Sequence, residues 1–389
     1  MDRRKGRSIH GNCYKRKPAV CVTVVLLALA ISITLLAYTA FATPIEDGAP
    51  QQVTFIFRHG DRTPTETYPL DPHANYKWPG GWGALTKKGM RQMYDVGRWM
   101  REKYGSLIGN EYRAESVSVR STYADRCIMS AQALLAGLFP PTPDEIFVPG
   151  LLWRPIPVHS TPRNLDKVIA VKAPCPRLDA ELRQAYVNDS LSRDALPAEY
   201  YQKLSALAGQ NTTTITDVEF LYNTLEIEEM NGLKLPEWTK EFYGPEMRRI
   251  AARSLAIFTS NALQQRLRGG PLVKEILENM RSAMGGNGKK AYLYSAHDIT
   301  IVNVLRTMGF TNELLKPDYG AVLILELHSV NGGQQGEVRV SYLNSTEATE
   351  AHPMRIPECG SPCYLENLID AWKDITPINW DAECAVSSA

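Results

Sequence analysis

The sequence predicts an α/β protein whose sheet is doubly wound, mostly parallel and flanked by helices, with a smaller, mainly helical cap inserted. A strand pattern is followed by an amphipathic helix pattern twice before residue 140, which is typical of parallel strands joined by crossover helices. Residues 140–245 differ, because they hold many prolines and mostly helical or irregular patterns. We therefore expect the cap at 140–245 and the α/β core at 43–139 and 246–389.

The first part of the predicted core begins with VTFIF, whose β-branched and aromatic side chains are typical of a buried strand. Thr86 precedes an amphipathic pattern and is a suitable helix N-cap. Between the two lies a segment rich in proline, glycine and tryptophan, which predicts a loop. In order, we expect a linker over 43–52, a strand over 53–57, a loop over 68–83, a helix from Thr86, a strand over 116–120 and a helix over 124–139.

The second part of the core returns to the sheet after a helical stretch. Ile250, Leu255 and Leu263 lie on or near one face of a helical projection, which predicts one long amphipathic helix near 246–267. The further elements are a helix over about 271–283, a strand over 291–298, a helix near 299–308, and strands within 319–330 and 337–343 that form a hairpin at the sheet edge.

The N-terminus has the features of a targeting signal. Residues 1–18 carry seven Lys or Arg and one acid, whereas residues 19–42 contain no charged residue and are long enough to span a bilayer. Two alternatives stay open, a cleaved signal peptide and an uncleaved signal-anchor helix. In both, the basic flank keeps the N-terminus cytoplasmic and places residues 43–389 in the secretory lumen or outside the cell.

The rest of the chain is mildly acidic. Of the 43 basic and 42 acidic residues, 36 and 41 respectively lie after residue 18. This balance gives no support to nucleic-acid binding. Glycosylation sequons begin at Asn188, Asn211 and Asn344, and they agree with a secretory compartment.

Five cysteines follow the hydrophobic run, and an oxidising compartment would favour their pairing. Cys359 and Cys363 can close a tight local loop, which would leave Cys175 and Cys384 for a long-range bridge. Cys127 lies in an apolar helical pattern and is expected to be a buried free thiol. Zinc binding by the close pair is the alternative, but no second close pair or nearby histidine completes such a site.

Polar side chains crowd the ends of three predicted strands, at residues 58–62, 120–126 and 295–298. In an open α/β sheet, ligands bind at the carboxyl ends of the strands. If these strands are neighbours, three arginines meet two histidines and an aspartate, namely Arg58, Arg62, Arg126, His59, His297 and Asp298. Phosphate fits such a set best, because a guanidinium binds two phosphate oxygens at once.

His59 is the candidate nucleophile of this site. Nearby positive charge lowers the pKa of an imidazole, which keeps a ring nitrogen free to attack phosphorus in mild acid. Asp298 is the candidate proton donor to the leaving alcohol, because a bound phosphate raises the pKa of a nearby carboxyl. Gly60 is expected to let the chain turn close to the ligand. These residues together predict an acidic pH optimum.

Each of these residues also has an ordinary structural explanation, and it is their combination that carries the prediction. The chemical alternative is a metal site formed by His59, Asp61, His297 and Asp298. The arginines argue against it, because they already supply the positive charge that a metal would bring. Arg120 is expected to support the site rather than to touch substrate.

The motifs resemble those of the histidine acid phosphatases, a branch of the phosphoglycerate-mutase-like superfamily. RHGDRTP at 58–64 matches the family's R-H-G-x-R-x-P, and YSAHD at 294–298 matches its His-Asp motif. Longer stretches such as VRSTYADRCIMSAQALLAGLFPP and LLWRPIPVH look like the animal lysosomal and prostatic type. The likeness covers roughly residues 52–384, and it implies a phosphoglycerate-mutase-like fold.

The resemblance also implies the chemistry, a phosphomonoesterase that needs neither metal nor cofactor and works through a phosphohistidine. The implied roles are phosphate binding by Arg58, Arg62, Arg126 and His297, phosphoryl transfer by His59 and proton donation by Asp298. The implied disulfides are Cys175–Cys384 and Cys359–Cys363, and the implied homodimer has Trp153 and His159 as interface candidates. Tyr123 departs from the family by replacing an acid that many relatives carry, which bears on substrate preference.

The predicted function is an acid phosphatase that hydrolyses small phosphate monoesters to an alcohol and orthophosphate. Alternatives at the level of the substrate are lysophosphatidate and inositol phosphates. Alternatives of other classes are a mutase of the same superfamily, a metallophosphatase and a non-catalytic phosphate-binding protein. The membrane is a partner only if residues 19–42 stay uncleaved, and the lysosome, the cell surface and secretion are the alternative destinations.

Overall fold

The computed structural model describes residues 48–357 and 359–385. The predicted basic tail at 1–18 and hydrophobic segment at 19–42 lie outside the described residues. Within the described part of the chain, no helix is both long and apolar enough to cross a membrane.

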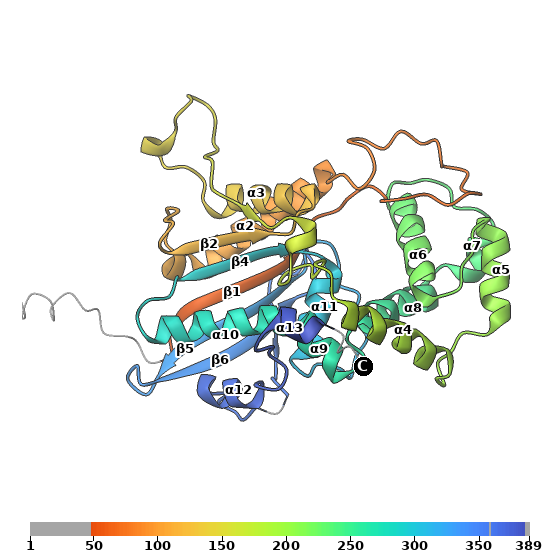
Figure 1. Cartoon of the computed structure of the whole chain (residues 1–389). Helices are drawn as coiled ribbons and strands as arrows, with labels where there is room; N and C mark the ends of the chain where they lie inside the picture. Colours follow the sequence, from red (N-terminus) through yellow and green to blue (C-terminus); the bar gives the residue numbers. More distant parts are fainter. Residues whose placement is uncertain (1–47, 358, 386–389) are drawn as a thin grey trace, which may run out of the picture. The chain divides into compact units, whose positions relative to one another are not determined.

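The core is a mixed sheet of seven strands in the order β3-β2-β4-β1-β5-β6-β7 (Figure 1). The four strands from β3 to β1 in this order are parallel to one another. β5 then pairs antiparallel with β1, β6 with β5, and β7 with β6. The predicted hairpin is β5 and β6, and the short β7 extends it to the sheet edge. The strands are β1 (Pro50–Arg58), β2 (Val117–Ser121), β3 (His159–Ser160), β4 (Ala291–Ala296), β5 (Val322–Val330), β6 (Gln335–Leu343) and β7 (His352–Met354).

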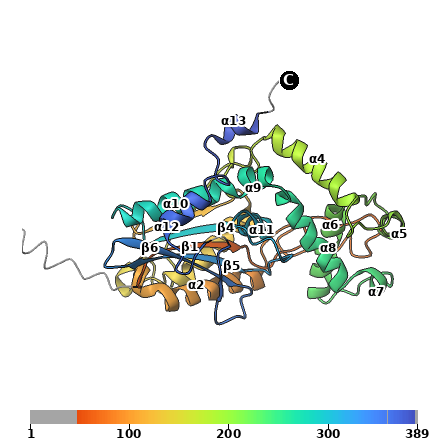
Figure 2. The same ribbon diagram turned by 90° about the horizontal axis from the view of Figure 1, so that it is seen from below.

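Helices cover both faces of this sheet (Figure 2). On one face, α2 (Lys87–Ile108) and α3 (Asp125–Leu138) pack on apolar side chains of β1 such as Phe55 and Phe57. The other face is covered by α10 (Gly270–Met284), α11 (Asp298–Thr307) and α12 (Leu365–Ala371). Thr86 caps α2 as predicted, because its side chain accepts a hydrogen bond from the Gly89 amide. The doubly wound architecture is therefore confirmed.

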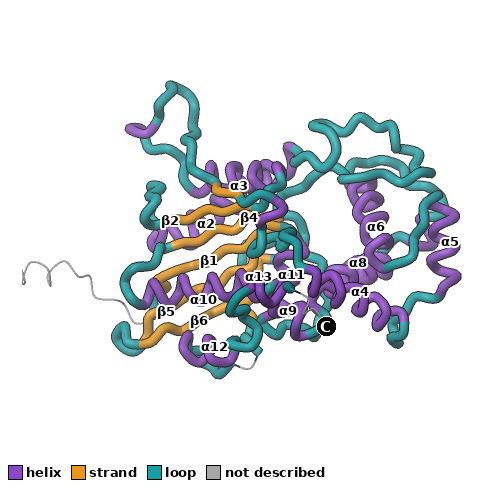
Figure 3. The backbone as a smooth tube through the Cα atoms, viewed as in Figure 1, coloured by secondary structure: helices purple, strands orange, loops and turns teal. Residues whose placement is uncertain are grey.

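Helices and loops make up most of the predicted cap (Figure 3), and an apolar cluster separate from those at the sheet lies among its helices. Its helices are α4 (Pro176–Ser190), α5 (Ala198–Ala208), α6 (Ile215–Met230), α7 (Thr239–Phe242) and α8 (Pro245–Ala256). The limits differ from the predicted 140–245. His159 and Ser160 join the sheet as β3, and α8 buries Met247 and Ile250 in the cap core. Their burial assigns α8 to the cap, which no local pattern indicates.

Two predicted boundaries are wrong. The long helix near 246–267 is broken into α8 and α9 (Ala262–Arg268), with a 3-10 turn, η3 (Ile257–Thr259), between them. The break follows from capping, since the side chain of Asn261 accepts a hydrogen bond from the Gln264 amide and begins a new helix. β1 begins at Pro50, inside the predicted linker, and the buried side chain of Gln52 donates to the carbonyls of Asn279 and Lys289.

Two disulfides join the same cysteine pairs that the resemblance implies. Cys175, just before α4, is bonded to Cys384 in α13 (Trp380–Cys384). Cys359 is bonded to Cys363. The fifth cysteine of this part of the chain, Cys127, is buried and free.

Candidate active site

The strand order brings the three polar motifs to one edge of the sheet. β1 pairs in parallel with β4, with Arg58 opposite Ala296, and β2 pairs in parallel with the other side of β4, with Ser121 opposite Ser295. The carboxyl ends of the three strands therefore lie side by side. The residues that follow them, from residue 59, from residue 122 and from His297, meet at this edge.

His59 has a defined tautomer in this setting. Its Nδ1 lies 2.9 Å from the carbonyl oxygen of Gly60, and the Nε–H of Arg126 points at its Nε2 from 3.1 Å. A carbonyl only accepts and a guanidinium only donates, so Nδ1 carries the proton and Nε2 presents a lone pair. Burial lowers the pKa of His59 well below its usual range, and the charges of Arg126, Arg58 and Arg62 add to this effect.

His297 lies next to His59, with the ring centroids 5.5 Å apart and the rings nearly perpendicular. Its Nε2 is 3.2 Å from the Thr122 hydroxyl, and the Cys127 thiol lies 3.8 Å from both ring nitrogens. Burial, followed by the charge of Arg126, lowers the pKa of His297 to about 3. Burial also raises the pKa of the Cys127 thiol to about 11, so this cysteine is a neutral part of the wall.

Arg58 and Asp298 form an ion pair at 2.9 Å, and only 3% of the Arg58 side chain is exposed. Arg58 also donates to the carbonyl of Pro317 at 2.6 Å and stacks over the Tyr319 ring at 4.0 Å. Burial opposes ionisation of Asp298, but the charges of Arg58 and Lys316 outweigh it and hold the pKa of this carboxyl well below its usual range. Asp298 is therefore a carboxylate in the free protein.

Arg62 is buried beside the same centre, where it donates to the carbonyl of Thr63 at 3.0 Å and acts electrostatically on both histidines. All six predicted catalytic and phosphate-binding residues are thus brought together. Arg120 is not part of this group, because both carboxylate oxygens of Glu275 bind it, at 2.5 and 2.6 Å.

Gly60 packs against α2. A Cβ at this position would lie 2.4 Å from the backbone oxygen of Gly89, so the first turn of α2 requires glycine here. Its closeness to a ligand stays a prediction. Asp61 likewise bonds to this turn, since its carboxylate accepts from the Thr86 hydroxyl at 2.5 Å. The described residues hold no cluster of three or more His, Cys, Asp or Glu side chains placed to bind a metal ion.

Sequence reasoning missed three buried residues of the site. Tyr319 stacks on Arg58, and the ammonium of Lys316 donates to Asn223 of α6 at 2.9 Å. Asn223 in turn donates to Glu219 at 3.2 Å, and Glu219 and Lys316 both act electrostatically on each other and on Asp298. The cap is thereby coupled to the catalytic edge. One feature could have indicated Lys316 and Tyr319. They directly precede the strand β5, and an antiparallel β5 starts at the edge of the sheet where β1 ends.

The remaining predicted residues lie on the surface. The sequon residues Asn188, Asn211 and Asn344 are all exposed, as glycan attachment requires. Trp153 and His159 are also exposed and lie away from the two histidines, in the loop after α3 and in β3.

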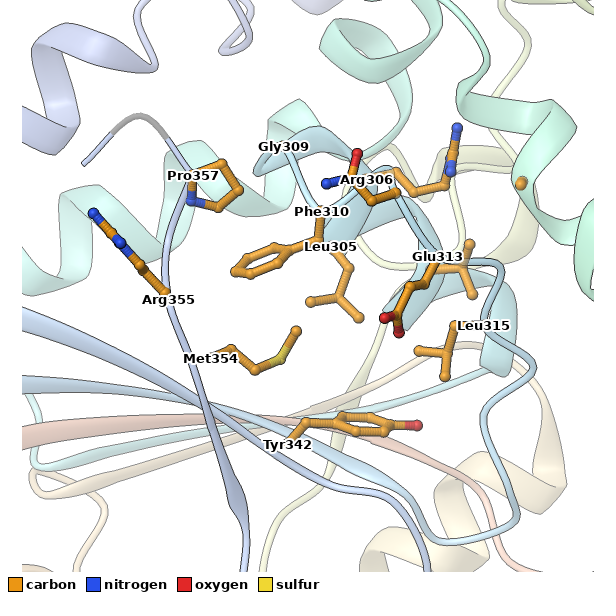
Figure 4. Close-up of a pocket in the computed structure, with 13 residues that line it drawn as sticks. Leu305, Arg306, Gly309, Phe310, Glu313, Leu315, Tyr342, Met354, Arg355 and Pro357 are labelled. Carbon is orange, nitrogen blue, oxygen red and sulfur yellow. The ribbon is translucent and has the colours of Figure 1, made fainter. Parts of the chain in front are cut away.

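A cavity of about 410 Å³ lies apart from this site, between α11 and the strands β6 and β7. Figure 4 shows Leu305, Phe310 and Met354 around it, with the Tyr342 ring below. None of the predicted catalytic or phosphate-binding residues lines this cavity.

The fold and the site define an α/β protein that holds a buried cluster of arginines and histidines at the carboxyl edge of its sheet. The chain belongs to branch 2 of the histidine phosphatase superfamily, whose family model matches residues 51–343. Rat prostatic acid phosphatase is 35% identical over 86% of this chain and 89% of the relative. Human lysosomal acid phosphatase is 35% identical over 86% of this chain and 80% of the relative.

Solved structures show the same fold at lower identity. The phytase from Citrobacter braakii superposes with a TM-score of 0.65 and 17% identity, covering 87% of this chain and all of the phytase. The Hafnia alvei phytase bound to tartrate has a TM-score of 0.64 and 16% identity, covering 88% of this chain and 99% of the phytase. At this identity the likeness concerns the fold alone.

Proposed function

We propose that the protein is an acid phosphatase that hydrolyses phosphate monoesters through a phosphohistidine on His59. The observation that carries this proposal is the unprotonated Nε2 of His59 in contact with Arg126, with Arg58 and Arg62 nearby. A nucleophile surrounded by guanidinium groups suits a phosphoryl group, whose charge the guanidinium groups offset throughout the transfer.

In the first step, the phosphate displaces the Arg126 contact and Nε2 of His59 attacks phosphorus. The bond from phosphorus to the ester oxygen breaks, and the leaving alkoxide takes a proton from Asp298. In the second step, a water molecule attacks the phosphohistidine while the Asp298 carboxylate takes its proton. As orthophosphate forms, the bond from phosphorus to Nε2 breaks and His59 regains its lone pair. Asp298 stays protonated until the orthophosphate departs.

The proton on Asp298 has to arrive with the substrate, because this carboxyl is ionised in the free protein. A phosphate monoester carries a proton below about pH 6. When the ester binds, its charge competes for Arg58 and repels the carboxylate, so the proton moves from phosphate to Asp298. The proposal therefore assigns the acidic optimum to the protonation state of the substrate, because His59 is already neutral in the free protein.

A trapping experiment tests the covalent intermediate. We expect a ³²P-labelled aryl phosphate, mixed with enzyme and quenched in alkali within milliseconds, to label the protein on the peptide that contains His59. The label should survive alkali, be lost in acid and form equally in the presence of excess chelator. Release of labelled phosphate without any protein-bound label during steady turnover would refute the phosphohistidine.

The substrates that we propose are small phosphate monoesters, since the relatives with the higher identity are acid phosphatases. The likeness to phytases is one of fold. The two disulfides fit a protein of the secretory pathway, and the three exposed sequons agree with it. We propose a lumenal or extracellular catalytic domain, attached to the membrane only if residues 19–42 are retained.

We further propose a homodimer built on the loop between α3 and β3. This loop projects from the sheet beside α3 (Figure 1) and exposes Phe147, Leu152 and Trp153, with 72% of Leu152 accessible. The Phe147 and Trp153 rings pack edge to face at 6.4 Å. Exposed apolar side chains are unfavourable in water, and this loop places several of them next to the edge strand β3. Such a surface indicates a protein–protein interface.

Leu152→Asp should convert this dimer into a monomer, because a carboxylate would be desolvated at the interface. Light scattering after size exclusion measures the mass directly. Leu191→Asp is the matched control, since Leu191 is 81% exposed at the end of α4 and outside this loop. A wild-type protein that is monomeric at micromolar concentration, or a dimer that survives Leu152→Asp, would contradict this interface.

A further inference from the structure

The segment from Lys316 to Tyr319 connects the cap to the catalytic edge and holds Arg58 from two sides. The guanidinium of Arg58 donates to the Pro317 carbonyl at 2.6 Å, and its central carbon lies 4.0 Å from the centre of the Tyr319 ring. The centre of the Tyr319 ring is also 5.9 Å from that of the His59 ring. Whatever fixes this segment therefore also fixes the direction of the Arg58 guanidinium.

The contacts of Arg58 leave one of its donors for a ligand. Nη1 points at the Pro317 carbonyl and Nη2 at the Asp298 carboxylate. The Nε–H is buried and has no hydrogen-bond partner among the described residues. A buried donor without a partner is unfavourable, and a phosphate oxygen that accepts from it would remove this cost. The orientation of Arg58 thus decides whether the free donor faces the phosphate.

Lys316 anchors the segment to the cap by a buried hydrogen-bonded chain. Only 6% of Lys316 is exposed, and its ammonium donates to Oδ1 of Asn223 in α6 at 2.9 Å. Nδ2 of Asn223 donates to one carboxylate oxygen of Glu219 at 3.2 Å, and the Ser254 hydroxyl of α8 donates to the other at 2.9 Å. Since an ammonium only donates, the Asn223 amide has to turn its oxygen to Lys316 and its nitrogen to Glu219.

A second tie between this segment and the cap lies on the surface. Arg248 of α8 pairs with Asp318 at 2.7 Å and donates to the Lys316 carbonyl at 3.3 Å, but the side chains of Arg248 and Asp318 are both exposed. Exposed ion pairs contribute little to stability, whereas a buried cation that loses its partner is strongly unfavourable. Lys316 is therefore the main anchor of the segment.

We propose that Lys316 is a positioning residue for phosphate binding, which acts through residues 317–319 on the guanidinium of Arg58. This inference rests on the proposed function, in which Arg58 binds the phosphoryl group. The cap then contributes to the affinity for phosphate from a distance, because α6 holds Lys316 and the residues that follow Lys316 hold Arg58.

A double-mutant cycle with Arg58 tests this inference. Lys316→Met should lower both kcat/KM for p-nitrophenyl phosphate and the affinity for inorganic phosphate by about 10-fold, because Arg58 loses its direction. In the Arg58→Met background the same substitution should change either quantity by less than about 2-fold, since no guanidinium remains to be positioned. A purely structural role of Lys316 gives equal losses in both backgrounds, and that result would overturn the proposal, as would a Lys316→Met variant with unchanged phosphate affinity.

A second variant separates positioning from stability. Lys316→Met alone leaves the buried Glu219 without its cation, whereas Lys316→Met/Glu219→Gln removes both charges and should unfold at a higher temperature than the single variant. The loss of phosphate affinity should nevertheless persist, and its recovery together with stability would refute positioning. Arg253→Met is the matched control, because Arg253 is a buried cation of α8 that pairs with Asp189 of α4. Its effect should be the same with and without Arg58.

Failure of the proposed function would give a different result. The affinity for inorganic phosphate, measured by calorimetry, needs no phosphohistidine, so the cycle between Lys316 and Arg58 can show coupling even if His59 is never labelled. Normal labelling of His59 in the wild type, together with equal losses in the two Arg58 backgrounds, would refute the role of Lys316 alone.

Discussion

His59→Ala should abolish the phosphoenzyme and lower kcat for p-nitrophenyl phosphate by at least about 10,000-fold. Nε2 of His59 is the acceptor that Arg126 contacts, and alanine has no atom at that point. His297 does not substitute for it, since its ring stands nearly perpendicular to that of His59 and its Nε2 faces Thr122. The guanidinium groups alone would bind phosphate without transferring it.

Pre-steady-state quenching and steady-state turnover measure the two effects of His59→Ala separately. Phosphate should still protect the variant against thermal unfolding, because Arg58, Arg62 and Arg126 remain. His352→Ala is the control, since His352 is an exposed residue of β7 at the opposite end of the sheet from β3. A folded His59→Ala variant that retains labelling, or that turns over within about 10-fold of wild type, would remove His59 from the mechanism.

Asp298→Asn should slow alkyl phosphates by about 100- to 10,000-fold, and aryl phosphates with good leaving groups far less. Asparagine keeps the shape of the side chain but has no acidic proton for an alkoxide. A phenolate departs without protonation, so its ester needs Asp298 mainly as the partner of Arg58. A series of esters with leaving alcohols of increasing pKa measures this difference as a steeper dependence of log kcat on leaving-group pKa in the variant.

The wild type and Asp298→Asn should differ in their pH dependence. The reason is the lowered pKa of the Asp298 carboxyl in the free wild-type protein, which leaves the substrate to bring the proton. In the wild type, kcat/KM for alkyl phosphates should fall as the pH rises above about 6, because the ester then no longer brings a proton. For an aryl phosphate in the variant, this fall should weaken, since no proton is delivered to the leaving oxygen. An equal loss for alkyl and aryl esters would make Asp298 a positioning residue for Arg58 rather than the acid.

The architecture could be predicted because each strand and helix of the core carries its own periodic pattern. VTFIF is β-branched or aromatic throughout and forms the centre of a buried strand, β1. The helix after Thr86 has its cap and its apolar stripe in the local sequence, and α2 starts there. The polar residues at three strand ends indicated one site, because parallel strands end at one edge.

Other features depend on long-range contacts and have no local signature. The apolar stripe over 246–267 continues through the break at Asn261, because α8 buries it in the cap and α9 buries it against α4 and α13. Tyr319 and Lys316 are remote from both motifs in sequence. They reach the site only because β5 runs antiparallel next to β1, which pairs Phe57 with Val322.

The sequence by itself determined which groups are available for the proposed catalysis, since residues 58–62 and 297–298 supply histidines, arginines and a carboxyl. The tertiary structure alone decided their state. Nε2 of His59 is free because Gly60 and Arg126 take up fixed positions around the ring, and Asp298 is ionised because Arg58 is held against it. Charge and protonation depend on distance and burial, and both arise only when the sheet brings distant segments together.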